Sequence, residues 1–112
     1  MEFKVREVDN VIIIEAPKRL EGKTSLEFRK KIIELADSGV YKIVVDLNGT
    51  EFMDSNGVSS LVSRISVTRS NNGDVALLSP SEFIKNILKI THLDKIFKIY
   101  DNEDDAIKAL NS

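Results

Sequence analysis

The segment from Tyr41 to Asp46 restricts the fold more than any other part of the chain. It carries apolar side chains at three consecutive positions, Ile43, Val44 and Val45, instead of alternating them with polar ones. Consecutive β-branched residues predict a strand that is buried on both faces, as is typical of a parallel sheet. Because parallel strands are joined by long crossovers, usually helices, the rest of the chain should alternate between strands and helices.

The remaining hydrophobic pattern supports this alternation. The turn pair Asp9-Asn10 between two apolar stretches predicts a β-hairpin at the start of the chain. The elements predicted after the hairpin strands (3–8 and 11–14) are a helix capped near Thr24 or Ser25 and ending at Ser38-Gly39, the strand 41–46, a helix from Ser55 to Asn71-Asn72-Gly73, a strand 75–78, a helix capped near Ser81 and carrying Phe83, Ile84, Ile87 and Leu88, a strand 96–100 and a helix that begins within 101–105. The order ββαβαβαβα predicts a single α/β domain over residues 1–112, with a mostly parallel sheet, one antiparallel edge strand and right-handed β-α crossovers.

The composition argues against several classes of function. The chain has 112 residues, 16 of them basic and 18 acidic, with a formal net charge of -2, so no surface for nucleic acid is expected. It has no cysteine, which excludes disulfides and thiolate metal sites and fits a reducing, cytoplasmic environment. The longest aliphatic run, Val11 to Ile14, is far too short to cross a bilayer, so no membrane insertion is expected. No group of residues predicts a cofactor or a metal ion.

Ser55 lies where a helix is predicted to begin, within Asp54-Ser55-Asn56-Gly57. Asp, Ser and Asn commonly cap helices and Gly relaxes a tight turn, so a helix start alone can explain the tetrapeptide. A hydroxyl at this position is also exposed beside unsatisfied backbone N–H groups, whose partial positive charge would accommodate an attached phosphate. The local sequence leaves both interpretations open.

The stretch from Tyr41 to Val58 resembles the central signature of the anti-sigma factor antagonist, or STAS, family. In that family a hydrophobic strand ending in Asp-Leu leads to a Phe-x-Asp-Ser-x-Gly turn with a phosphorylatable serine, which matches Asp46-Leu47 and the segment from Phe52 to Gly57. Leu20 to Ser25 resembles the segment leading into the family's first helix, and Ile84 to Tyr100 resembles its closing helix and strand. The resemblance covers nearly the whole chain and implies a STAS-like fold.

The resemblance implies a phosphorylation-controlled binding module and not an enzyme. Without phosphate, it would sequester an anti-sigma factor that is a serine kinase, a histidine-kinase-like ATPase, and so free a sigma factor. Phosphorylation of Ser55 would end this contact. Asp54 would cap the helix and position the serine, Gly57 would allow the partner a close approach, and Asn56 stands where the family commonly has a second serine. An alternative is a STAS component of a transport or membrane-lipid assembly that docks to a nucleotide-binding subunit.

A band of serines extends the predicted partner surface. At about 100° per residue, Ser59, Ser63, Ser66 and Ser70 continue from Ser55 along one side of the predicted helix. Serine is a middling helix former, so helix propensity does not explain the band, which is either a docking surface of low relief or a solvated face. The predicted partner surface consists of Gly22, Thr24, Asp54, Asn56, Gly57, Ser59 and Ser63.

Two other kinds of site are disfavoured. Receiver domains of two-component systems have a similar length and place a phosphoacceptor aspartate at a strand end, as Asp46 or Asp54 would be. This chain lacks their Mg²⁺-binding acidic pair, and Tyr100-Asp101-Asn102 stands where they have Lys-Pro. The single histidine, His92, has no second metal ligand at a recognisable spacing, so it is expected at a helix C-terminus, where the helix dipole favours it.

Overall fold

The computed structural model describes residues 2–112 and contains a five-stranded sheet in the order β1-β2-β4-β6-β7. The strands are β1 (Val5–Val8), β2 (Val11–Glu15), β3 (Arg19–Leu20), β4 (Lys42–Asp46), β5 (Phe52–Met53), β6 (Asp74–Leu78) and β7 (Ile99–Tyr100). The helices are α1 (Gly22–Asp37), α2 (Ser55–Val62), α3 (Ile65–Ser70), α4 (Glu82–Ile90) and α5 (Glu103–Leu110), with a short 3₁₀ helix η1 (Leu93–Lys95). Within this sheet β1 and β2 pair antiparallel and the other neighbours pair parallel, which confirms the predicted topology.

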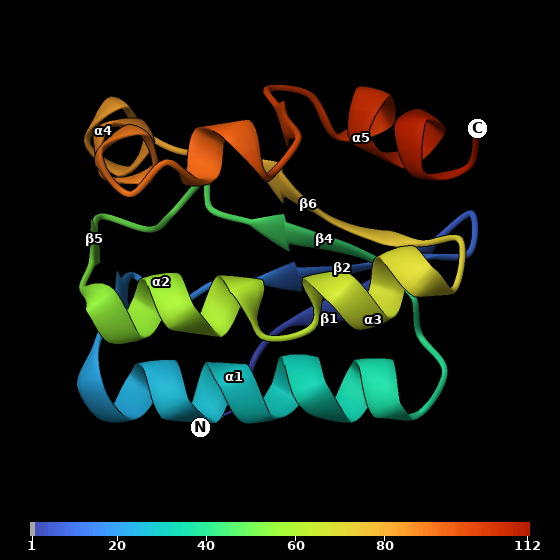
Figure 1. Cartoon of the computed structure of the whole chain (residues 1–112), viewed down its shortest axis with the longest axis horizontal. Coiled ribbons are helices and arrows are strands. Elements are labelled where there is room, and N and C mark those ends of the chain that lie inside the picture. Colours follow the sequence, from blue (N-terminus) through green and yellow to red (C-terminus); the bar gives the residue numbers. More distant parts are fainter. Residues whose placement is uncertain (1) are drawn as a thin grey trace.

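The central strand β4 is buried on both faces, as its sequence predicted. Ile43, Val44 and Val45 are all fully buried. Ile43 and Val45 belong to a core that includes residues of α1 and α2, whereas Val44 belongs to a second core that includes residues of α5. Figure 1 shows the corresponding layers, with α1, α2 and α3 on one side of the sheet and α5 on the other.

A second, two-stranded sheet lies at the end of the molecule to which β2 and β4 point (Figure 1). It consists of β3 and β5, which pair parallel with Arg19 opposite Phe52 and Leu20 opposite Met53. The sequence did not predict these strands, since two-residue strands are too short to show a periodicity. Their pairing places the segment before α1 beside the segment before α2, and α4 packs against β5.

The helix predicted from Ser55 to Asn71 is in fact two helices, α2 and α3. The hydroxyls of Ser60 and Ser63 donate to the carbonyls of Gly57 and Ser60, at 2.6 and 2.9 Å, and such bonds compete with the regular helical ladder. The next residue, Arg64, leaves the helical conformation with φ of -131° and ψ of 20°, and its Nε donates to Asp37 of α1 at 3.3 Å. The continuous helix was therefore a wrong prediction, because hydroxyl bonding and an ion pair to a neighbouring helix override the apolar periodicity.

Other boundaries shift by a few residues. Helix α1 begins at Gly22 and not at a cap near Thr24 or Ser25, and Ser25 is buried inside the helix. Part of the strand predicted over 96–100 is non-strand backbone after η1, and α5 starts at Glu103 behind the Asn102 cap. His92 lies just after α4, as expected, in a left-handed conformation with φ of 63°. Within residues 2–112, none of the helices has the length and apolar character needed to span a membrane.

The core under α1 gives a direct test of the fold. Phe28 is fully buried and packs edge-on against Phe3, with ring centroids 5.1 Å apart and planes at 84°. Phe28→Ala should lower the free energy of unfolding by about 3–5 kcal/mol, measured by urea denaturation, because it leaves a cavity. Leu26 on the same helix is 54% exposed, so Leu26→Ala should change stability by less than about 0.5 kcal/mol. Equal effects of the two variants would contradict the described packing of α1.

Candidate functional site

The carboxylate of Asp54 joins the N-termini of two helices. Asp54 is the N-cap of α2, and its Oδ1 accepts a hydrogen bond from the Gly57 N–H at 2.9 Å. Its Oδ2 accepts from the N–H of Gly22, the first residue of α1, at 3.1 Å. Glu21 precedes α1 but makes no side-chain cap, so α1 takes this cap from Asp54. The structure confirms the predicted cap of α2 and adds the link to α1.

These hydrogen bonds lower the pKa of the Asp54 carboxyl below its ordinary value of 3.8. The bond from the Gly57 N–H is the largest cause, and the bond from Gly22 acts in the same direction. Partial burial raises the pKa and opposes this effect without overcoming it. Asp54 is therefore ionised at neutral pH, as a carboxylate that serves two positive helix ends should be.

Gly57 has no room for a side chain, because other residues of the chain pack closely against it. It is buried, and a Cβ at this position would lie 2.2 Å from the carbonyl oxygen of Leu20 and 2.7 Å from Cγ of Met53. The missing side chain therefore lets α2 pack against β3. The sequence analysis predicted that the absence of a side chain at Gly57 would let a partner approach closely. That prediction was wrong, because the backbone of Leu20 occupies the space.

Ser55 is exposed at the first position of α2, beside the Asp54 cap. Asn56, Ser59 and Gly22 are also exposed, and Thr24 is half-buried. The Asp54–Gly22 bond joins the turn before α2 to the first turn of α1, at the end of the molecule where β4 points in Figure 1. Most of the predicted partner surface is thus adjacent and accessible.

The serine band is not continuous. Ser63 is half-buried, and its hydroxyl donates to the Ser60 carbonyl instead of facing a partner freely. The break at Arg64 then separates the exposed Ser66 and Ser70, on α3, from Ser59. Only the α2 part of the band, Ser55 and Ser59, is an exposed extension of the turn.

An aromatic pair beside the turn escaped prediction from sequence. The rings of Phe52 and Phe83 stack with centroids 6.2 Å apart and planes at 29°. The guanidinium carbon of Arg19 lies 4.6 Å from the centroid of the Phe52 ring, and its Nε donates to Glu21 at 2.6 Å. Phe83 lies on α4, as predicted, and is 54% exposed, whereas its neighbour Ile84 is fully buried.

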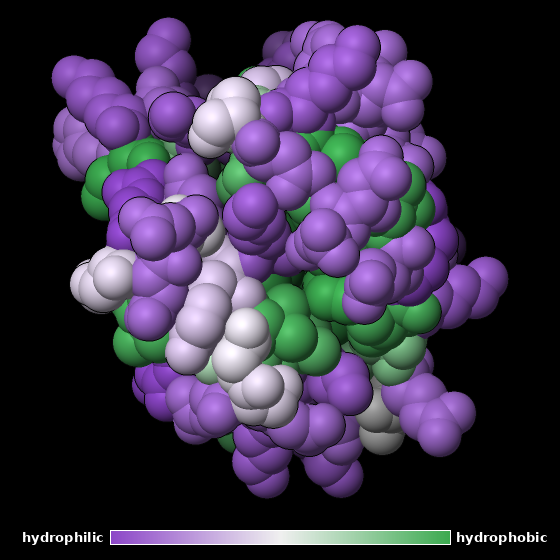
Figure 2. Space-filling view, turned by 90° about the vertical axis from the view of Figure 1, so that its right-hand side faces the viewer, coloured by the Kyte–Doolittle hydropathy of each residue, from purple (hydrophilic) through white to green (hydrophobic). Residues whose placement is uncertain are grey.

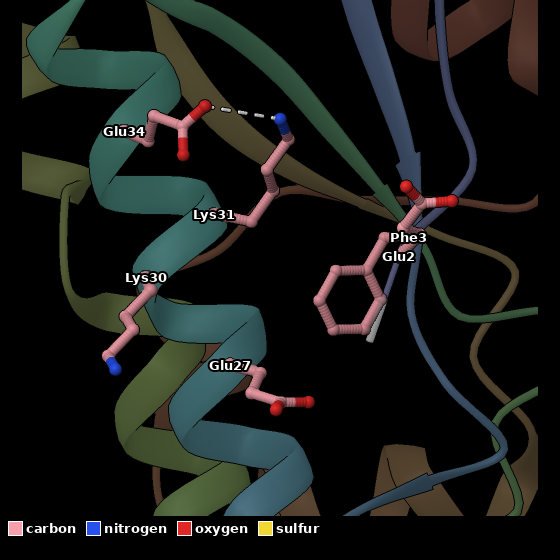
Figure 3. A pocket seen from close by; sticks show the side chains of 6 residues that line it. All are labelled: Glu2, Phe3, Glu27, Lys30, Lys31 and Glu34. Carbon is pink, nitrogen blue, oxygen red and sulfur yellow. Dashed lines mark hydrogen bonds and ion pairs between the residues drawn. The ribbon is translucent and has the colours of Figure 1, made fainter.

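Two hollows of the surface lie apart from this turn. An open cavity of about 540 Å³ lies between α1 and the residues that precede β1 (Figure 3). Its lining carries both charges, and Lys31 pairs there with Glu34 at 3.3 Å. A second hollow, of about 300 Å³ and including Ile12, Val40 and Tyr41, lies at the opposite end of the molecule, the face shown in Figure 2. Neither includes a residue of the predicted partner surface.

The double cap predicts a specific loss of stability. Asp54→Ala removes the acceptor for two backbone N–H groups, so it should lower the free energy of unfolding by about 1–2 kcal/mol near pH 7. Ser81 caps α4 alone, through Ile84, so Ser81→Ala should have about half that effect. A smaller effect of Asp54→Ala than of Ser81→Ala in urea denaturation would contradict the double cap.

The same contact predicts a pH dependence. Because folding lowers the pKa of Asp54, its stabilisation is fully present above 3.8 and is lost as the pH falls through the folded value. The difference in unfolding free energy between the parent protein and Asp54→Asn should therefore be largest near about pH 6 and shrink below about pH 4. Ser81→Ala, which removes a helix cap made by a hydroxyl and not by a carboxylate, is the control and should lower the unfolding free energy by a similar amount across this range. A difference that is constant over this range would contradict the lowered pKa.

A family model and several known proteins match almost the whole chain. The family model described as STAS domain matches residues 2–106. A Thermotoga maritima protein, provisionally named an anti-sigma factor antagonist, is 33% identical over 109 residues, 96% of each chain. The crystal structure of TM1081, also from Thermotoga maritima and likewise named provisionally as an anti-sigma factor antagonist, superposes with a TM-score of 0.89, at 30% identity over 98% of this chain and 95% of that one. The Anti-sigma F factor antagonist of Paenibacillus polymyxa is 26% identical over 111 residues, 98% of this chain and 95% of that protein.

A structural match at lower identity shows the same fold. The anti-sigma factor antagonist SpoIIAA in its unphosphorylated form has a TM-score of 0.84 at 22% identity, over 98% of this chain and 96% of its own. The phosphorylated form of the Bacillus protein SpoIIAA matches with a TM-score of 0.74, over 96% and 98% of the two chains. Since the family model covers almost the whole sequence and the Thermotoga relative exceeds 30% identity along it, the chain belongs to the STAS domain family.

Proposed function

We propose that this chain is an anti-sigma factor antagonist, and that phosphorylation of Ser55 ends its binding to an anti-sigma factor. The observation that carries the proposal is the double cap by Asp54, which holds an exposed serine hydroxyl beside the joined N-termini of α1 and α2. The names of the Thermotoga and Paenibacillus relatives support the class of function. That SpoIIAA has been solved with and without phosphate supports a switch of this kind in the fold.

The proposed mechanism is a change of surface charge with little change of fold. A phosphate on Ser55 adds about -1.5 to -2 charges and three acceptor oxygens. The positive ends of the helix dipoles of α1 and α2 favour a negative group here, and they offset its repulsion from the Asp54 carboxylate. The folded domain therefore tolerates the phosphate. A partner surface that fits the neutral hydroxyl would instead meet a bulky dianion and be released.

The proposed partner is an anti-sigma factor that is also the serine kinase, a histidine-kinase-like ATPase. The unphosphorylated domain would sequester this kinase in the cytoplasm and so free a sigma factor. The contact would centre on Ser55 and include Asn56, Ser59 and the first turn of α1 with Gly22 and Thr24, which the Asp54–Gly22 bond joins to the turn. The domain itself would supply a binding surface and the acceptor hydroxyl, with no catalytic group of its own.

The phosphorylation step can be tested with the purified anti-sigma factor ATPases of the source organism. Incubation with one of them and ATP should add a single phosphate, which mass spectrometry should map to Ser55. Ser55→Ala should abolish the labelling, while Ser59→Ala, one helical turn away, should keep it. Full labelling of Ser55→Ala would show that another residue is the acceptor.

The phosphomimetic variant separates binding from folding. Because helix N-termini stabilise an added negative charge by some tenths of a kcal/mol up to about 1, Ser55→Asp should keep its melting temperature within a few degrees. Its affinity for the same kinase, measured by calorimetry, should fall strongly. An unfolded Ser55→Asp would contradict the exposed position of the serine, and unchanged affinity would contradict the switch.

The extent of the contact along α2 is tested by a pair of charged substitutions. Ser59 lies one turn beyond Ser55, so Ser59→Arg should push the partner away and cost about 2 kcal/mol, roughly thirtyfold in affinity. Ser66 is also an exposed serine, but it lies on α3 beyond the break, and Ser66→Arg should bind like the parent. Equal affinity of both variants would limit recognition to the Ser55 turn and the first turn of α1.

A further inference from the structure

Helix α4 exposes apolar side chains beside the Ser55 turn. Ile84 and Leu88 are fully buried and attach α4 to the core. Phe83 and Ile90 lie seven positions apart, hence on one face of the helix, and are 54% and 68% exposed. The folded domain therefore leaves about half or more of each of these two side chains uncovered, as an outer stripe of α4.

The stripe continues into an organised contact between distant segments. The ring of Phe83 stacks on that of Phe52, whose own ring also contacts the Arg19 guanidinium. Single, scattered apolar residues are ordinary on a protein surface. Phe52 and Phe83 instead form a contiguous stacked pair with an arginine beside it. Aromatic residues and arginine are also the residue types that contribute most to binding at protein interfaces.

This surface is continuous with the turn. Phe52 and Met53 form β5, and Asp54 and Ser55 follow directly in the chain. Arg19 lies opposite Phe52 in the β3–β5 pair, and the same segment leads through Leu20 to the Gly22 N–H that Asp54 holds. Backbone pairing thus fixes the aromatic stack and Ser55 in one arrangement. Phe52 of the stack precedes Ser55 by three positions in the chain.

The charges around the stack indicate the chemistry of such a partner. Arg19 pairs with Glu21 and Lys85 with Glu82. Lys23, in the first turn of α1, and Lys89, in the last turn of α4, are exposed and make no ion pair within residues 2–112. These unpaired cations lie on α1, which the Asp54 cap joins to the turn, and on α4, which carries Phe83, and they suit a partner with an apolar centre and carboxylates around it.

We propose that Phe52, Phe83 and Ile90, with Arg19, form a second part of the partner-binding surface. We call these four residues the aromatic surface. It receives an apolar side-chain cluster with an acidic rim on the anti-sigma factor kinase. The inference rests on the proposed function and adds to it a contact that does not touch the acceptor hydroxyl. The aromatic surface therefore contributes to affinity for the kinase and not to the chemistry at Ser55.

The test compares Phe83→Ser with Ile96→Ser, using the kinase that phosphorylates the parent protein. Ile96 is 43% exposed after η1 and lies outside the aromatic surface. Phe83→Ser should weaken binding about tenfold or more and raise the KM for its phosphorylation by a similar factor, with kcat retained. Ile96→Ser should stay within about twofold of the parent in both measurements. Ile90→Ser provides a second variant should Phe83→Ser fold poorly.

The outcomes separate the two proposals. If Ser55→Asp loses binding while Phe83→Ser and Ile90→Ser bind like the parent, the aromatic surface is no part of the contact, and the proposed function stands. If the parent neither binds nor accepts phosphate from any anti-sigma factor kinase of its organism, both proposals are overturned. If sedimentation shows that the parent self-associates and Phe83→Ser does not, a second copy covers the surface and the inference is overturned.

Discussion

The Asp54 carboxylate accepts hydrogen bonds from backbone N–H groups at the starts of two helices that are far apart in the sequence. The geometry around Ser55 depends on these two hydrogen bonds. The carboxylate fixes the start of α2 through Gly57 and the start of α1 through Gly22. The absence of a Cβ at Gly57 allows the turn to lie against Leu20, so the two segments also touch directly. Two helix N-termini and one exposed hydroxyl therefore form a single, connected surface.

This arrangement explains how one modification could change binding and leave the fold intact. The residues that hold the turn are buried or engaged in hydrogen bonds, whereas Ser55 itself is exposed. A phosphate there meets helix dipoles that favour negative charge, and it disturbs only molecules that approach from outside. The aromatic surface on β5 and α4 adjoins the Ser55 turn, because β5 leads directly into it. Affinity for the kinase and control by phosphorylation can therefore reside in neighbouring groups of residues.

The sequence predicted features that arise from local pattern. The consecutive apolar residues of β4 predicted a parallel sheet, and Asp54 predicted the cap of α2, because both effects act within a few residues. It did not predict the Asp54–Gly22 bond or the stack of Phe52 on Phe83, since both join distant segments and neither leaves a periodic signal. The break before α3 was also missed, because it depends on the Ser60 and Ser63 hydroxyls and on the Arg64–Asp37 pair between helices.

The most direct test of the bridge is an NMR titration of the Gly22 and Gly57 amide protons from about pH 2 to 7. If both donate to one carboxylate, both chemical shifts should follow a single titration whose midpoint lies below 3.8, the ordinary pKa of aspartate. The same two shifts should stop titrating in Asp54→Asn. A Gly22 amide that does not respond, or that titrates at a different pH from the Gly57 amide, would contradict the account of a shared cap.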